Sequence, residues 1–146
     1  MRRLLLPFAA LLALSLLASD SPRDDDATTV AVTLDGEWQL VSQEIQGKTT
    51  TNPQDGMIFR KGEFTWTGPG FNPKGDYKVD AARTPAWVDM TATNMPQGSY
   101  VLVGIYLTDG DLLKMAWNSD TAERPRGFES SPDTRVLVYT FKRVRK

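Results

Sequence analysis

Beyond residue 30 the chain is divided into short apolar runs by turn-forming residues that recur about every 8–14 residues, the spacing typical of an all-β sandwich or barrel. Glycine, proline, asparagine and aspartate supply these turns. No stretch carries the sustained period of an amphipathic helix. Because most links are short, the pattern favours a single antiparallel up-and-down barrel that closes on itself.

The alternation of apolar and polar residues predicts eight strands, all within one domain at residues 34–146. Side chains two residues apart share a face, so Trp38, Leu40 and Ser42 are expected on one side of the first strand. The segment Tyr100–Leu107 is apolar on both faces, which indicates that another part of the molecule covers one of them. The expected strands are Gly36–Ile45, Gly56–Arg60, Glu63–Thr67, Gly75–Asp80, Ala86–Thr91, Tyr100–Leu107, Asp111–Trp117 and Arg135–Arg143.

The dipeptide Asp109-Gly110 lies between two strand-like runs and predicts a tight hairpin turn, with both residues at positive φ. The alternative is a role for Asp109 as a general base or metal ligand, with Asp111 close by. This segment lacks the alternating oxygen donors, the glycine and the distant glutamate of a calcium loop. We therefore interpret the dipeptide as turn geometry.

The first residues have the order of an export signal. Two arginines precede a 15-residue apolar run at positions 4–18, and small residues follow before Asp20. The run is shorter than the roughly 18–20 residues of a permanent membrane helix. We expect a signal peptide at 1–19 and a flexible acidic linker at 20–33. The mature protein is then exported to the periplasm, the cell envelope or the outside of the cell; an uncleaved anchor is the alternative.

Composition excludes several classes of function. The chain has no histidine and no cysteine. It therefore lacks Cys–His and Ser–His–Asp nucleophile systems and the usual ligand sets for zinc, copper, haem and iron–sulfur clusters. The net charge of −1 becomes −3 when the two arginines of the signal are removed, which argues against nucleic acid as a partner. We expect no cofactor, no metal and no permanent membrane span.

Several short motifs are spread along the chain: Gly36-Glu37-Trp38-Gln39-Leu40-Val41 with Gly47-Lys48, Pro85 with Val88-Asp89-Met90-Thr91, Gly104-Ile105-Tyr106, Gly110-Asp111-Leu112-Leu113-Lys114, Arg124-Pro125 with Phe128, and Lys142-Arg143. Together they resemble an uncharacterised planctomycete-type family of lipocalin-like (calycin) domains. They cover almost all of the chain from residue 34 to 143. The resemblance implies a calycin-type barrel, often found in exported proteins, and no established activity.

The resemblance also implies how the barrel closes. In lipocalin-like barrels a Gly-x-Trp on the first strand sits at the closed end, beneath an arginine from the last strand. Here this implies closure by Gly36, Trp38 and Arg143, with the guanidinium across the indole. Such a cation–π contact is worth about 0.5–2 kcal/mol. Trp38 and Arg143 also fall on the inward faces that alternation predicts.

The candidate ligand-binding residues are large side chains expected in the barrel interior or at its mouth: Trp66, Trp87, Tyr106, Met115, Trp117, Arg124 and Phe128. The aromatic and thioether groups suit a partly apolar ligand, but an eight-stranded barrel is just wide enough for them to fill it. Arg124 and Phe128 lie in the long last connection. They form either a lid or anion site or a packing contact at the barrel's edge, and we favour packing. Phe71, in a turn-rich loop, either touches a ligand or belongs to a plain loop.

Three functions remain open. The first is binding of a small, partly apolar molecule in the barrel. The second is a cell-envelope interaction or scaffold domain with a solid core, an envelope protein as partner and no small ligand. The third and remote one is a carboxylate-dependent hydrolase, which needs two acids about 5–10 Å apart. We expect no enzyme, because the available aspartates fall mostly at turns or strand ends, where aspartate is common: Asp76, Asp80, Asp89, Asp109 and Asp111.

Overall fold

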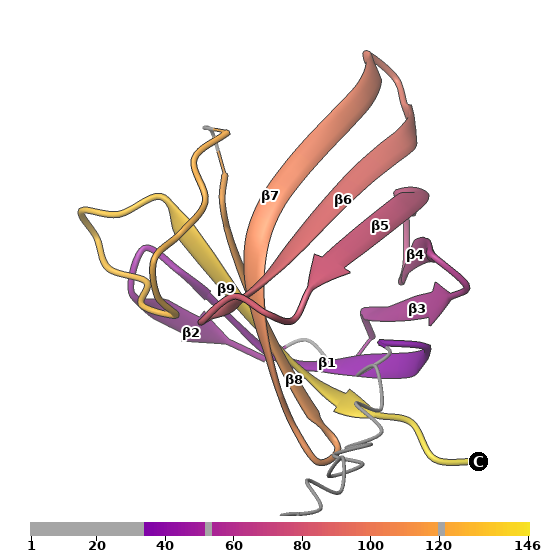
Figure 1. The fold of residues 1–146 in the computed structure, drawn as a ribbon, viewed down its shortest axis with the longest axis horizontal. Coiled ribbons are helices and arrows are strands. Elements are labelled where there is room, and N and C mark those ends of the chain that lie inside the picture. Colours follow the sequence, from indigo (N-terminus) through magenta and orange to yellow (C-terminus); the bar gives the residue numbers. More distant parts are fainter. Residues whose placement is uncertain (1–33, 52–53, 120–121) are drawn as a thin grey trace, which may run out of the picture.

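Antiparallel strands, without any helix, make up the part of the chain that the computed structural model describes, residues 34–51, 54–119 and 122–146 (Figure 1). The expected signal peptide at 1–19 and linker at 20–33 lie outside the described residues. The all-β class is confirmed. In chain order the strands are β1 (Gly36–Ile45), β2 (Lys48–Thr50), β3 (Gly56–Arg60), β4 (Glu63–Thr67), β5 (Lys74–Asp80), β6 (Ala86–Met95), β7 (Gly98–Asp109), β8 (Leu112–Asn118) and β9 (Val136–Arg143).

Pairing of the first strand with the last closes the sheet. Neighbours run in the order β1-β3-β4-β5-β6-β7-β8-β9, and β9 pairs back with β1. The predicted barrel of eight strands in a meander is therefore confirmed. The additional strand, β2, pairs with β1 alone. Sequence patterning misses it because its three residues are all exposed and show no alternation. Strands β6 and β7 also extend past their predicted ends and form a long hairpin (Figure 1).

The hairpin between β7 and β8 is present, but its turn differs from the predicted one. Asp109 pairs with Leu112, so Gly110 and Asp111 are the two central residues. Gly110 has a φ of 58°, and neither aspartate has a positive φ. A positive φ at the first central residue alone is the type II′ pattern, which needs glycine only there. The prediction that Asp109 and Gly110 form the turn with two positive φ angles was therefore wrong by one residue.

A β-bulge in β1 changes which side chains face inward. The register with β9 shifts between Leu40 and Ser42. The extra residue moves the alternation by one position, so Ser42 pairs with Thr140 and Gln43 pairs with Tyr139. The prediction that Ser42 shares the inward face of Leu40 was wrong for this reason.

The closed end of the barrel is built around Trp38. Its side chain is 2% exposed, and its Nε1 donates a hydrogen bond of 2.8 Å to the Leu34 carbonyl. The guanidinium carbon of Arg143 lies 4.2 Å from the indole centroid, and Arg143 Nη1 donates to the Asp35 carbonyl at 2.9 Å. Gly36 has a φ of 137°, and a Cβ there would come within 2.6 Å of Arg143 Nη1. Glycine is therefore required for the arginine to reach the tryptophan.

The connection between β8 and β9 packs over the outside of the barrel. Ile105, Ala116 and Val138 point outward from β7, β8 and β9, yet each is at most 1% exposed. Phe128, from the connection, packs against them. This contact buries Ile105 in a second, smaller core, but Val101 and Leu107 on the same outer face are 56% and 53% exposed. The expectation that another part of the molecule covers one face of Tyr100–Leu107 therefore holds only around Ile105.

The closed end offers a direct test of the fold's anchoring contact. Trp38→Ala should lower the free energy of unfolding by about 3–5 kcal/mol, because a large buried side chain is lost. Arg143→Ala should cost less, and the double variant should lose less than the sum of the two, because the side chains touch. Chemical denaturation of the four proteins measures this coupling. Strictly additive losses would show that Arg143 does not act through Trp38.

Candidate functional site

The barrel contains a cavity of about 390 Å³ near the β6–β7 hairpin tip and the loop at residues 68–73. Side chains from β3, β4, β6, β7, β8 and β9 contribute to its wall, so it lies inside the barrel. Aromatic, aliphatic and thioether groups predominate. The lining residues are Met57, Phe64, Trp66, Phe71, Pro73, Met90, Ala92, Met95, Tyr100, Leu102, Trp117, Ser119, Leu137 and Tyr139.

Three rings form one aromatic wall of this cavity. Trp117 and Tyr139 are stacked, with ring centroids 4.6 Å apart and 13° between their planes. Trp66 meets Tyr139 edge-on, at 5.7 Å and 85°. Aromatic pairs prefer such offset or edge-to-face arrangements. Phe141, which is fully buried, lies behind this wall at 6.0 Å from Trp66 and 6.3 Å from Tyr139. The wall is therefore supported from within the core.

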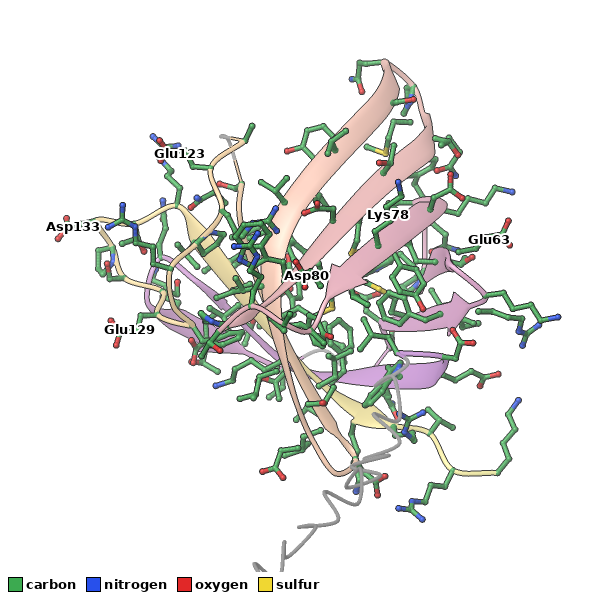
Figure 2. All side chains as sticks on the ribbon, viewed as in Figure 1. Glu63, Lys78, Asp80, Glu123, Glu129 and Asp133 are labelled. Carbon is green, nitrogen blue, oxygen red and sulfur yellow. The ribbon has the colours of Figure 1, made fainter. Side chains whose placement is uncertain are left out.

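Charge is kept away from the cavity. None of the described residues that line it is ionisable apart from the two tyrosines, and exposed charged side chains such as Glu63, Glu129 and Asp133 lie at the periphery of the molecule (Figure 2). Burial, and secondarily the negative charge of Asp55, raise the pKa of Tyr139 above its usual value. The Tyr139 hydroxyl is therefore protonated at neutral pH and serves as a hydrogen-bond donor.

The loop at residues 68–73 brings Phe71 to the rim of the cavity. Asn94 on β6 holds this loop at two points: its Nδ2 donates to the Asn72 carbonyl at 3.0 Å, and its Oδ1 accepts from the Lys74 amide at 2.8 Å. The Trp66 amide also donates to the Pro73 carbonyl at 2.8 Å. Phe71 is 54% exposed, so this aromatic ring borders both the cavity and the solvent.

Of the seven candidate ligand-binding residues, Trp66 and Trp117 line the cavity. Met115 is fully buried in the main core. Tyr106 is 3% exposed and borders a separate cavity of about 290 Å³ beside residues 81–86 and 107–108. Its hydroxyl is buried without a hydrogen-bond partner in the described part of the chain. Burial, followed by the nearby Asp80, raises the Tyr106 pKa.

Trp87, Arg124 and Phe128 lie on the outer face and do not line the cavity. The expected interior or mouth position is therefore wrong for Trp87, whereas Arg124 and Phe128 make packing contacts, the alternative that we favoured for them over a lid or anion site. Trp87 pairs with the outward-facing Ile105, and neighbours across a sheet share a face. The Arg124 guanidinium lies 4.2 Å from the Trp87 ring centroid, and its Nη1 donates to the Gly104 carbonyl at 2.7 Å and lies 2.8 Å from Asp89 Oδ1. Arg124 thus attaches the last connection to the barrel wall.

Sequence reasoning missed most of the cavity wall. Leu137 and Tyr139 share the face of Arg143 on β9, which alternation predicts to be inward, but alternation alone does not show whether an inward residue packs solidly or borders a space. Met95 lies near the tip of the β6–β7 hairpin, between the predicted strands Ala86–Thr91 and Tyr100–Leu107, and Tyr100 is the first residue of the second of these. Because the prediction ended the first strand four residues too early, it did not place Met95 beside Tyr100 at the barrel's mouth.

No family model, curated protein or solved structure matches this chain. Within the described residues, no group of three or more carboxylates is placed to hold a metal ion. No helix in that part of the chain is long and apolar enough to cross a membrane. The candidate site therefore rests on the geometry of the barrel.

Met115 is a core residue that tests whether the packed interior and the cavity are independent. Met115→Ala should reduce the free energy of unfolding by about 2–5 kcal/mol, because the side chain is fully buried. Binding of an apolar dye should be retained at temperatures where the variant is folded, because Met115 does not line the cavity. Denaturation and dye titration measure the two effects. A small stability loss with altered dye binding would instead place Met115 at a solvated pocket.

Proposed function

We propose that this barrel binds a small, largely apolar molecule in the cavity beside the β6–β7 hairpin. The observation that supports the proposal is the cavity itself: its volume of about 390 Å³ falls in the range of about 300–1,000 Å³ typical of small-molecule sites. Its lining also has the composition of such sites, with many apolar and aromatic groups and a few polar ones.

The main alternative, a scaffold domain with no small ligand, requires a solid core. An eight-stranded barrel is narrow enough to be filled by its own side chains, and the closed end is filled: Leu113, Met115 and Phe141 are fully buried. The same barrel holds a cavity at the hairpin end, where Trp66 and Tyr139 are only partly buried. This contrast within one barrel favours ligand binding over the scaffold function.

A carboxylate-dependent reaction has less support. The cavity has no carboxylate among its described lining residues. Asp89 is occupied by Arg124 at 2.8 Å on the outer face, and Asp111 by Arg145 at 2.7 Å near the β7–β8 turn. Because these two acids serve ion pairs outside the cavity, we propose a binding protein without catalytic residues.

We further infer that the chain belongs to the lipocalin-like family its motifs resemble and that it is exported. The closed barrel is compatible with a calycin-like fold, and Gly36, Trp38 and Arg143 meet as that resemblance implies.

Export is tested by N-terminal sequencing of protein from the envelope fraction. If the signal peptide at 1–19 is removed, the sequence should begin near Asp20. A protein that retains Met1 and is recovered from the cytosol would contradict export.

Filling the cavity tests the binding function. Leu102 lines the cavity from β7, whereas its neighbour Val101 is 56% exposed on the outer face. Leu102→Trp should weaken binding of the neutral dye N-phenyl-1-naphthylamine by about tenfold or more, which is about 1.4 kcal/mol, because the added ring occupies the dye's space. Fluorescence titration measures the dissociation constant.

Val101→Trp is the matched control, since it adds the same ring to the same strand on the opposite face. It should bind the dye as the wild-type protein does. Equal binding by both variants would place the dye outside the cavity. Failure of the folded wild-type protein to bind any apolar dye would favour the scaffold function.

A further inference from the structure

The arrangement of rings in the cavity favours a flat ligand. The stacked pair Trp117–Tyr139 and the perpendicular Trp66 present ring surfaces in two orientations within one wall. A planar ligand can therefore stack on one ring while its edge meets the face of another, the two arrangements that aromatic groups prefer. Met57 and Met90 add flexible thioethers, which adapt to irregular shapes and contact ring edges favourably.

The absence of cationic groups from this wall disfavours an acidic ligand. Transfer of a carboxylate or sulfonate from water into an apolar site is costly unless a positive group compensates it. No lysine or arginine is among the described lining residues. The nearby charge that affects Tyr139 is the negative one of Asp55, which would repel an anion further. No carboxylate is among the described lining residues either, so an organic cation also lacks a counter-charge in the wall.

One polar group in the aromatic wall is suited to orient a ligand. Of the two tyrosines that line the cavity, Tyr100 donates its hydroxyl hydrogen to the Ser119 carbonyl at 3.4 Å. No hydrogen bond to a described residue occupies the Tyr139 hydroxyl, and one face of its ring is covered by Trp117. Tyr139 therefore offers a ligand its hydroxyl as a donor.

We infer that the ligand is an uncharged, planar aromatic molecule that carries a hydrogen-bond acceptor such as a carbonyl oxygen, with its rings against Trp66 and Trp117 and its acceptor bonded to the Tyr139 hydroxyl. This inference rests on the proposed function, because it concerns the same cavity. It adds two requirements that binding of an apolar molecule alone does not contain, namely selection against charge and a defined polar contact.

The charge requirement is tested with two dyes that share one ring skeleton. N-phenyl-1-naphthylamine is neutral, and 8-anilinonaphthalene-1-sulfonate carries one negative charge. The neutral dye should bind at least about tenfold more tightly in fluorescence titrations. Equal or tighter binding of the sulfonate at the cavity, or displacement of the neutral dye by tetramethylammonium, would overturn the inference and leave the proposed function in place. If neither dye binds, the proposed function fails as well.

The polar contact is tested with a neutral naphthyl ketone, 6-propionyl-2-(dimethylamino)naphthalene, whose emission shifts to the red when its carbonyl accepts a hydrogen bond. In Tyr139→Phe the affinity for the ketone, relative to that for N-phenyl-1-naphthylamine, should fall by about fivefold, as expected for one lost hydrogen bond. The emission of the bound ketone should also shift to the blue. An unchanged affinity ratio and an unchanged emission would overturn the role of Tyr139.

Tyr106→Phe is the matched control. It removes the hydroxyl of a tyrosine of the same barrel that is 3% exposed and does not line the cavity. It should leave the affinity ratio of the two probes and the emission of the bound ketone unchanged. If Tyr106→Phe and Tyr139→Phe change both quantities alike, the effect comes from the barrel as a whole and the assignment to Tyr139 is wrong.

Discussion

The pairing of β1 with β9 is the contact on which the rest of the structure depends. It turns a row of strands into a closed barrel, which removes the free edges that an open sheet would leave. The same register places Trp38 opposite Arg143, so closing the sheet also brings the guanidinium onto the indole. The chain has no cysteine, so this contact works without a disulfide, and the buried side chains must hold the barrel together.

Closure also divides the strand residues into an inner and an outer set. Inside, the side chains of Met115 and Phe141 form the main core. Outside, Ile105 and Val138 would be exposed if Phe128 did not pack over them. Arg124 supports this outer layer, since its contact with the Gly104 carbonyl joins the connection to β7. The two arginines, Arg143 inside and Arg124 outside, each stack on a tryptophan, and both therefore serve the fold.

Much of this architecture could be predicted from the sequence, because turn residues and alternation are local signals. The bounds of β1, β3 and β4 agree with prediction, since glycines mark the starts or the turns of these strands. The bulge in β1 could not be predicted, because one extra residue leaves no pattern of its own. The position of Trp87 is also ambiguous from alternation, because Ala86, Trp87 and Val88 are all apolar. Only its pairing with Ile105 shows that the Trp87 side chain lies on the outer face.

The cavity follows from missing side-chain volume rather than from a special motif, which is why the sequence indicates it so weakly. Gly75 and Ala92 pair across β5 and β6, and Ala92 faces the cavity. At this position two neighbouring strands supply almost no side-chain volume. Two pairs further along, Tyr77 and Met90 supply large inward side chains: Met90 borders the cavity, and Tyr77 packs on Phe59 at 4.8 Å. The barrel is therefore solid where its strands present large groups to one another. It is hollow where small ones face Trp66 and Trp117, so the packed core and the cavity lie at different ends of one fold.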